Sequence, residues 1–310
     1  MSAAVHLLEL RLKSGESVSL IAKLREVGGS RDAQTGSRHE IAFYRNLADI
    51  AGVESPETYI AEYDESTHRI LLVQEYLKKG SVGTIQTYLS FADLERVLSA
   101  LAVMHAKWWN SEELAQLTQI RTFEQAMEGG ARQFKSGRYS GRLFLEKYGE
   151  YVHPEIASIY GSDYQWGPVF QAGFSGNRTL CHYDVAAKNL FLPEDRSAPP
   201  VFFDWELVIR GNIGVELAQA LAYCMAPEDH IRIPKILDDY LEKMIGLGVS
   251  DLTQETLWND FRHGLLVRLA APIALSSRGR PHSTALALEI LPRITSAVLA
   301  TNALELLERT

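Results

Sequence analysis

The residues best suited to chemistry in this sequence are two aspartates and an asparagine that surround a predicted β-hairpin. Two apolar runs, residues 189–192 and 201–203, flank a polar turn rich in proline, a pattern typical of paired strands. A hairpin places the start of one strand beside the end of the other, so Asn189 and Asp204 should be neighbours. Asp184 belongs to the loop that leads into the same edge. The sequence therefore predicts that two carboxylates and one amide converge there.

This set of side chains suits metal-assisted phosphoryl transfer. Mg²⁺ prefers oxygen ligands, which a carboxylate and an amide carbonyl supply. A second carboxylate that does not bind the metal can accept the proton of an attacking hydroxyl. Structural explanations compete with this one. The pattern H-x-D-x-x-x-x-N also arises by chance, Asp184 can cap the backbone amides of a turn, and Cys181 and His182 can be core residues.

The motif resembles the catalytic loop of kinase folds. His182, Asp184 and Asn189 follow the pattern H-x-D-x-x-x-x-N, and Asp204 follows on the next predicted strand. The resemblance is to the aminoglycoside phosphotransferase and choline kinase-like superfamily, and most closely to its ecdysteroid-kinase-like branch. It implies that Asp184 is the catalytic base and that His182, also in the catalytic set, braces the loop. It also implies that Asn189 and Asp204 bind the metal. Tyr183 departs from the glycine common at its position.

A lysine on the second predicted strand is the candidate phosphate-binding residue. Residues 17–24 alternate as a strand, with Lys23 on one face. In the resembling family a lysine here holds the α- and β-phosphates and pairs with a glutamate of the next helix. Glu40, on a helix predicted over 38–50, matches that glutamate. As alternatives, Lys23 is a solvated surface residue, and Ser37 with Glu40 forms only a capping box.

Two more strands, residues 58–63 and 69–74, form a second predicted hairpin in the same region. A polar, glycine-containing segment follows them. In the resembling family this crossing between lobes offers its backbone groups to the nucleobase. The resemblance therefore places the nucleotide against Glu75, Tyr76 and Leu77.

The composition argues against several classes of protein. The 310 residues carry 31 Lys and Arg against 39 Asp and Glu, a net charge of −8 with no basic run, so no nucleic-acid partner is expected. Cys181 and Cys224 lack metal-ligand spacing, which indicates a reducing, cytoplasmic location without structural zinc. No apolar stretch approaches the ~18 residues of a membrane span, so no membrane partner is expected either. The first residues also lack the basic start and cleavage site of a signal peptide. The oligomeric state is left open.

We expect an α+β, bilobal fold like that of protein kinases. Residues 1–76 should form a small, mostly antiparallel β-lobe with one helix, residues 77–82 the crossing, and residues 83–310 a mostly helical lobe that carries the catalytic hairpin. Within it, residues 113–170 correspond to the insertion that helps to form the acceptor pocket in the family. No glycine precedes Gly15, so the chain is expected to begin inside the glycine-rich loop that covers the phosphates.

The resemblance implies a kinase that uses ATP or GTP with Mg²⁺ to phosphorylate a hydroxyl group of a small molecule, whose identity the sequence does not define. A second hypothesis is a nucleotide-binding protein that is catalytically impaired by an incomplete phosphate-binding loop. A protein kinase is a third, which the lack of an Ala-Pro-Glu-like segment after Asp204 disfavours.

Two further features resemble the family. Glu216 precedes Leu-Ala, where the family usually has an aspartate that braces the catalytic loop, and its extra methylene leaves that bracing open. His105, Trp108 and Trp109 follow the pattern of a helix in the ecdysteroid-kinase-like branch. Large side chains at helical spacing usually fill a core, so we expect these three residues to be structural.

Overall fold

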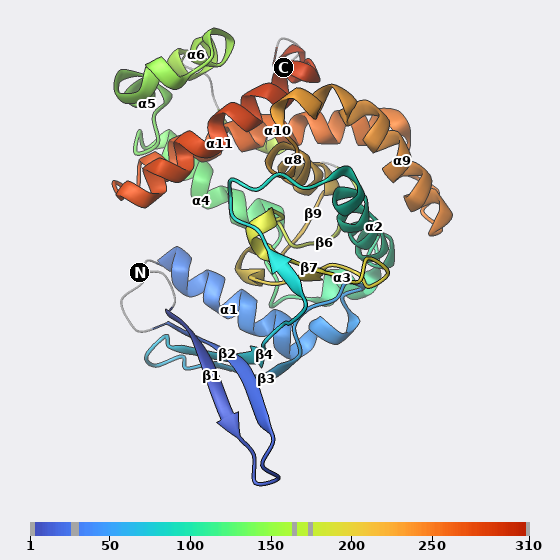
Figure 1. Cartoon of the computed structure of the whole chain (residues 1–310). Helices are drawn as coiled ribbons and strands as arrows, with labels where there is room; N and C mark the ends of the chain where they lie inside the picture. The colour runs from blue at the N-terminus through green and yellow to red at the C-terminus, as the bar shows by residue number, and fades with distance from the viewer. Residues whose placement is uncertain (1–3, 26–30, 163–165, 173–175, 308–310) are drawn as a thin grey trace.

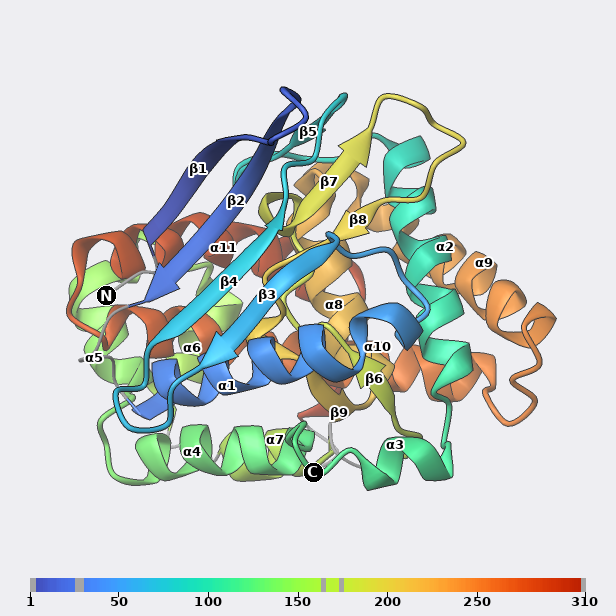
Figure 2. The same ribbon diagram turned by 90° about the horizontal axis from the view of Figure 1, so that it is seen from below.

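The N-terminal lobe is a four-stranded antiparallel sheet with one helix (Figure 1). The computed structural model describes residues 4–25, 31–162, 166–172 and 176–307. The elements of this lobe are β1 (Ala4–Arg11), β2 (Ser17–Arg25), α1 (Arg31–Asn46), β3 (Thr58–Tyr63) and β4 (Ile70–Glu75). The strand order is β1-β2-β4-β3, so β1 lies at the edge in Figure 2.

The alternation of β2 separates a small core from the cleft between the lobes. Leu20 and Ala22 pack with Val73 in a small apolar cluster on one face. Ile21 and Lys23 point to the other face and line the cleft. The predicted division of the strand is therefore confirmed, because side chains of a strand alternate with a period of two.

Helix α1 begins earlier than the sequence predicts. It runs from Arg31 to Asn46 rather than from residue 38, and a 3-10 turn over Ala48–Ile50 follows it. Ser37 is therefore buried inside the helix, where its Oγ accepts a hydrogen bond from Nη1 of Arg25 at 2.6 Å. The predicted capping box is wrong, because an N-cap residue needs a non-helical backbone. Part of the predicted preceding loop, residues 26–30, lies outside the described residues.

The C-terminal lobe is mostly helical, so the predicted bilobal α+β fold is confirmed (Figure 1). Its helices are α2 (Phe91–Lys107), α3 (Glu112–Gln116), α4 (Phe123–Lys135), α5 (Gly141–Tyr148), α6 (Pro154–Gly161), α7 (Trp166–Ala172), α8 (Ile213–Cys224), α9 (Ile233–Gly246), α10 (Gln254–Ser276) and α11 (Pro281–Ala300). Its strands are β5 (Gly80–Val82), β6 (Thr179–Cys181), β7 (Leu190–Pro193), β8 (Val201–Phe202) and β9 (Ile209–Gly211).

The predicted catalytic hairpin consists of β7 and β8. Leu190 pairs with Phe202, and the N–H of Phe203 donates to the carbonyl of Asn189 at 3.2 Å. Asn189 and Asp204 therefore lie at the same end of the hairpin, as predicted. On its other side β7 pairs with β5, so residues 80–82 of the predicted crossing form a strand of this sheet.

Two glycines let α8 and α10 cross at backbone contact. A Cβ on Gly214 of α8 would lie 2.2 Å from the carbonyl oxygen of Asp260, and one on Gly264 of α10 would lie 2.4 Å from the carbonyl oxygen of Gly214. Only glycine fits these positions without a shift of the backbone. The close crossing fixes α8, which carries Glu216 and Gln219 beneath the catalytic loop.

Helix α11 corrects one expectation from the sequence. It is long and apolar enough, by length and composition, to cross a membrane, contrary to the expectation that no stretch approaches that limit. Half of its most apolar window is buried, and α11 packs against α10 and α8. Its buried residues include Arg293, which donates to the backbone carbonyl of Tyr223 at 2.8 Å. These contacts are those of a core helix.

A buried histidine beside α11 gives a pH prediction. Burial lowers the pKa of His230 to about 4, below its ordinary value of ~6.5. Between pH ~6.5 and pH ~4, His230 therefore binds a proton in the unfolded chain but not in the folded chain. The neutral, buried His230 contributes fully to the free energy of unfolding above pH ~6.5, and this contribution is lost as the pH falls towards 4. His230→Gln cannot titrate. Between pH ~6.5 and pH ~4 the free energy of unfolding, measured by urea titration, should fall by roughly 2–3 kcal/mol less in this variant than in the parent protein. Parallel pH profiles for the two proteins would contradict this assignment.

Candidate active site

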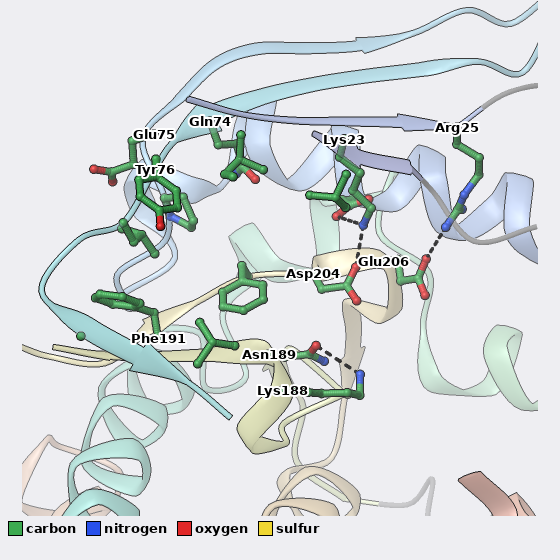
Figure 3. A pocket seen from close by; sticks show the side chains of 18 residues that line it. Lys23, Arg25, Gln74, Glu75, Tyr76, Lys188, Asn189, Phe191, Asp204 and Glu206 are labelled. Atoms are coloured by element: carbon green, nitrogen blue, oxygen red, sulfur yellow. Dashed lines mark hydrogen bonds and ion pairs between the residues drawn. The ribbon is translucent and has the colours of Figure 1, made fainter. Parts of the chain in front are cut away.

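A cleft of about 710 Å³ lies between the two lobes and contains most of the predicted site residues (Figure 3). The predicted residues that line it are Lys23, Glu40, Glu75, Tyr76, Leu77, Asn189 and Asp204. They come from five parts of the chain: β2, α1, the end of β4 with the crossing that follows it, the turn before β7 and the turn after β8. The fold therefore brings these residues, which the sequence predicts one segment at a time, together in one cleft.

Lys23 bridges the two lobes. Its Nζ donates to Oε1 of Glu40 at 2.7 Å and to Oδ1 of Asp204 at 2.6 Å (Figure 3). The three side chains are 15%, 1% and 29% exposed, so little water screens the pairs. Burial disfavours the charge on Lys23, but the two carboxylates outweigh it and raise its pKa. Burial raises the pKa of Glu40, which Lys23 opposes. The predicted pairing of Lys23 with Glu40 is present, in place of the capping box.

Asp204 sits in a sharp turn that directs its carboxylate into the cleft. Its backbone is left-handed, with φ 65° and ψ 56°, a conformation that aspartate adopts more readily than most residues. Burial works against its charge, but Lys23 lowers the pKa of this carboxylate below its usual value. The next residue, Trp205, stacks on Phe43 of α1 with ring centroids 3.7 Å apart. This contact fixes the turn against the helix that carries Glu40.

His182 braces the loop and does not reach the cleft. Its Nε2 lies 2.9 Å from the carbonyl oxygen of Phe203, so Nε2 carries the proton. Its Nδ1 then accepts from the backbone N–H of Asp184 at 3.2 Å. The ring is fully buried. His182 therefore ties the catalytic loop to the end of β8 as a positioning residue.

The carboxylate of Asp184 is held from both sides. Its Oδ1 accepts from Nε2 of Gln219 at 2.7 Å, and its Oδ2 accepts from Nζ of Lys188 at 2.7 Å. The Nδ2 of Asn189 also donates to Oδ2 at 2.8 Å. Neither Lys188 nor Gln219 was predicted. Lys188 lies inside the motif and could have been noticed there, whereas nothing in the sequence connects Gln219 with Asp184.

The amide of Asn189 is oriented to offer its oxygen. Its Nδ2 donates to both the carbonyl oxygen and Oδ2 of Asp184, each at 2.8 Å. Its Oδ1 therefore points the other way and accepts only from Nζ of Lys188, at 3.1 Å, among the described residues. An amide oxygen beside the carboxylate of Asp204 is a donor set that fits a hard divalent cation.

A buried network below the catalytic loop supplies the bracing that the sequence left open. Oε1 of Glu216 accepts from the backbone N–H of Tyr183 at 2.7 Å, and Oε2 is hydrogen-bonded to Nε2 of His105. The other ring nitrogen of His105 is hydrogen-bonded to the hydroxyl of Tyr240. Burial works against the charge of Glu216, but His105 and the Tyr183 amide hold its pKa below the usual value. The glutamate thus reaches the loop despite its extra methylene.

The same network brings His105, Cys181 and Glu216 within 4.8 Å of one another, a spacing that could suit a metal ion. However, His105 and Glu216 are already hydrogen-bonded to each other, and the second ring nitrogen of His105 is hydrogen-bonded to Tyr240. Burial also raises the pKa of the Cys181 thiol well above its usual value, and a neutral thiol is a poor metal ligand. This cluster is therefore a structural brace.

Glu216→Gln should test that brace. The amide cannot accept from both Tyr183 and His105 in the way a carboxylate does, so one buried donor loses its partner. We expect the free energy of unfolding to fall by about 1–3 kcal/mol in urea titrations. Glu95→Gln is the control, because Glu95 lies exposed on α2, and it should change by less than ~0.5 kcal/mol. Equal urea midpoints for the two variants would show that the hydrogen bonds of Glu216 do not stabilise the fold.

A second ion pair between the lobes was not predicted. Nη2 of Arg25 lies 3.0 Å from Oε2 of Glu206, and both residues line the cleft (Figure 3). At the other end of the cleft, Oε1 of Glu75 accepts from the backbone N–H of Glu57 at 2.9 Å. The Glu75 side chain is thus engaged with the chain ahead of β3.

Comparisons with known proteins agree with this geometry. The model of the phosphotransferase enzyme family matches residues 10–246, more than half of the chain. No curated protein sequence matches. A solved GDP and kanamycin complex of an aminoglycoside phosphotransferase is similar in fold, with a TM-score of 0.56 and 11% identity over 95% of this chain and 94% of that one.

Two solved kinases of small amino alcohols also share the fold. The Plasmodium vivax ethanolamine kinase has a TM-score of 0.54 and 10% identity over 94% of this chain and 81% of its own. The Cryptosporidium parvum choline kinase has a TM-score of 0.51 and 12% identity over 98% and 90%. The assignment to the ecdysteroid-kinase-like branch stays a prediction. The family match and the assembled cleft together show that this chain belongs to the phosphotransferase enzyme family.

Proposed function

We propose that this protein uses Mg²⁺ and ATP or GTP to phosphorylate a hydroxyl group of a small molecule. The observation that carries the proposal is the bridge from Lys23 to Glu40 and Asp204 across the cleft. A buried lysine between two carboxylates is held ready for the phosphates of a nucleotide. Structural ion pairs also occur at such positions, but this one opens onto a cleft of nucleotide size.

Each predicted residue has a role that its contacts support. The crossing around Glu75 to Leu77 would bind the nucleobase through its backbone, and Lys23 would bind the phosphates. Asn189 and Asp204 would hold Mg²⁺, which when bound neutralises charge on the phosphates. The Oδ1 of Asn189 faces away from Asp184 and is suited to this task.

Asp184 would accept the proton of the acceptor hydroxyl. Gln219 and Lys188 hold its two oxygens, so the carboxylate is oriented before the acceptor arrives. The ammonium of Lys188 lies between Asp184 and Asn189, where it can also stabilise negative charge that develops during transfer. His182 and Glu216 keep the loop in this geometry from below.

The similar proteins support a small acceptor and a nucleotide donor. One of them was solved with GDP and kanamycin, and others are ethanolamine and choline kinases. We also propose a cytoplasmic location, which the two free, buried cysteines, Cys181 and Cys224, support.

The direct test is a transfer assay with each nucleotide, with and without Mg²⁺. Hydroxylated small molecules, including amino alcohols, aminoglycosides, sugars and steroid alcohols, would be screened for stimulated release of ADP or GDP. Mass spectrometry would identify a product heavier by one phosphoryl group. We expect at least one acceptor to be phosphorylated only when Mg²⁺ is present. Nucleotide binding without transfer to any acceptor would favour the impaired nucleotide-binding protein instead.

A further inference from the structure

Arg25 is a second cation of the N-terminal lobe that lines the cleft. It stands two residues after Lys23 on β2, so both side chains point to the same face of the sheet. Its Nη2 lies 3.0 Å from Oε2 of Glu206, and its Nη1 donates to Oγ of Ser37 at 2.6 Å (Figure 3). The proposed function uses Lys23 and leaves Arg25 without a role.

The pairing of β2 with β4 places Arg25 at the end of the cleft opposite the crossing. Leu20 pairs with Glu75, the last residue of β4 before the crossing. Arg25, at the last position of β2, pairs with Ile70 at the other end of β4. Each residue of a strand adds about 3.3 Å, so Arg25 lies roughly 7 Å beyond Lys23. A nucleotide whose base contacts the crossing and whose first phosphates contact Lys23 would therefore extend towards Arg25.

Two ion pairs between the lobes lie side by side in the cleft. Lys23 contacts Asp204 at 2.6 Å, and Arg25 contacts Glu206 at 3.0 Å. Asp204 and Glu206 belong to the same turn after β8. Figure 3 shows the second pair farther from Tyr76 than the first. The pair of Arg25 and Glu206 thus lies beyond the proposed metal site, on the side away from the crossing.

A third cation, Lys188, reaches this region from the C-terminal lobe. It lines the cleft, and its Nζ donates to Oδ2 of Asp184 at 2.7 Å. Burial disfavours its charge, but the carboxylates of Asp184, Asp204 and Glu206 outweigh burial and raise its pKa. The carboxylate of Glu206 therefore acts on one cation from each lobe. Oxygens that carry negative charge are favoured at such a position, which suits a phosphate as well as a carboxylate.

Glu206 can leave Arg25 at little cost, whereas Arg25 is held in place. The side chain of Glu206 is 33% exposed and that of Arg25 is 11% exposed. An ion pair open to water contributes little to stability, because water solvates the carboxylate when it leaves. The guanidinium keeps its hydrogen bond to the buried Ser37 of α1 whichever anion it contacts. A phosphate brings more charge than a carboxylate and can therefore replace Glu206.

We propose that Arg25 binds the terminal phosphate of the donor nucleotide, in exchange for Glu206. This rests on the proposed function, in which Lys23 binds the inner phosphates and Asp204 the metal. The planar guanidinium offers paired N–H donors that match two oxygens of one phosphate. The cleft would thereby prefer a nucleoside triphosphate to the diphosphate. After transfer the spent nucleotide lacks this phosphate, so Glu206 would return to Arg25 and favour release.

The experiment compares nucleotides that differ in the terminal phosphate. Calorimetry in the presence of Mg²⁺ would measure binding of ADP, GDP and the non-hydrolysable imido analogues of ATP and GTP. We expect the parent protein to bind a triphosphate analogue more tightly than its diphosphate. Arg25→Gln should weaken binding of the triphosphate analogue roughly 10- to 100-fold and change that of the diphosphate by less than about threefold. Arg25→Lys, which keeps the charge and loses the fork, should fall between the parent and Arg25→Gln.

Two further variants separate phosphate binding from a purely structural role. Glu206→Gln removes the ion pair between the lobes but leaves the guanidinium in the cleft, so its affinity for the triphosphate analogue should equal or exceed that of the parent protein. Arg45→Gln is the matched control, because Arg45 pairs with Glu62 in an exposed ion pair of the same lobe and does not line the cleft. It should bind each nucleotide like the parent. Urea titration would establish that each variant is folded, and Arg25→Lys carries the comparison if Arg25→Gln does not fold.

The outcomes distinguish this inference from the proposed function. Equal losses for triphosphate and diphosphate in the Arg25 variants, or a matching loss in Glu206→Gln, would overturn the inference and leave Arg25 as a brace between the lobes. A parent protein that does not prefer the triphosphate would overturn it too. In each of these cases, transfer to an acceptor would leave the kinase function intact. A triphosphate preference that depends on Arg25, without transfer to any acceptor, would uphold the phosphate site and reject the kinase function.

Discussion

Asp184→Asn should reduce turnover by roughly 10²-fold or more, the usual scale for loss of a general base. An amide cannot take the proton of the acceptor hydroxyl. It also cannot accept from Gln219 on one side and from Lys188 and Asn189 on the other, as the carboxylate does. Nucleotide affinity should change little, because Lys23 pairs with Glu40 and Asp204 and not with Asp184.

The measurement is steady-state transfer together with nucleotide affinity for the same preparations. Asp195→Asn is a matched control, because it makes the same chemical change in the same hairpin, at the exposed turn between β7 and β8. It should turn over like the parent protein. If Asp184→Asn also does so, Asp184 is not the base.

Asp204→Ala should abolish the part of nucleotide affinity that depends on Mg²⁺. The substitution removes the charged member of the proposed metal pair, and it leaves Lys23 with Glu40 alone. Asn189→Ala should weaken the same dependence less, because a neutral amide oxygen contributes less than a carboxylate to the binding of a hard cation. We therefore expect the Mg²⁺ dependence of nucleotide affinity to be lost in Asp204→Ala and only weakened in Asn189→Ala.

Nucleotide affinity measured across a range of Mg²⁺ concentrations checks this order. Asp195→Ala controls for removal of a carboxylate from the same hairpin, and its affinity should rise with Mg²⁺ as in the parent protein. Affinity that still rises with Mg²⁺ in Asp204→Ala would remove Asp204 from the metal site. Such a result would also remove the main chemical support for the proposed kinase.

Local patterns in the sequence predicted the elements whose structure depends on neighbours along the chain. The β7–β8 hairpin and the face of β2 that carries Lys23 follow from turn residues and a period of two. The position of Asn189 beside Asp204 follows from the hairpin alone. The start of α1 did not follow, because Ser37 and Glu40 have the spacing of a capping box and yet both lie inside the helix.

The sequence by itself thus determined the fold class, the family and the residues of the motif. Tertiary structure alone decided which distant groups complete the site. Gln219 holds Asp184 from 35 residues away, Glu216 holds the backbone of Tyr183 from 33 away, and Arg268 does so from 85 away. Periodicity and turn chemistry describe contacts between near neighbours, whereas these contacts depend on how α8 and α10 pack together under the catalytic loop. That packing requires two glycines, Gly214 and Gly264, whose role no local pattern predicts.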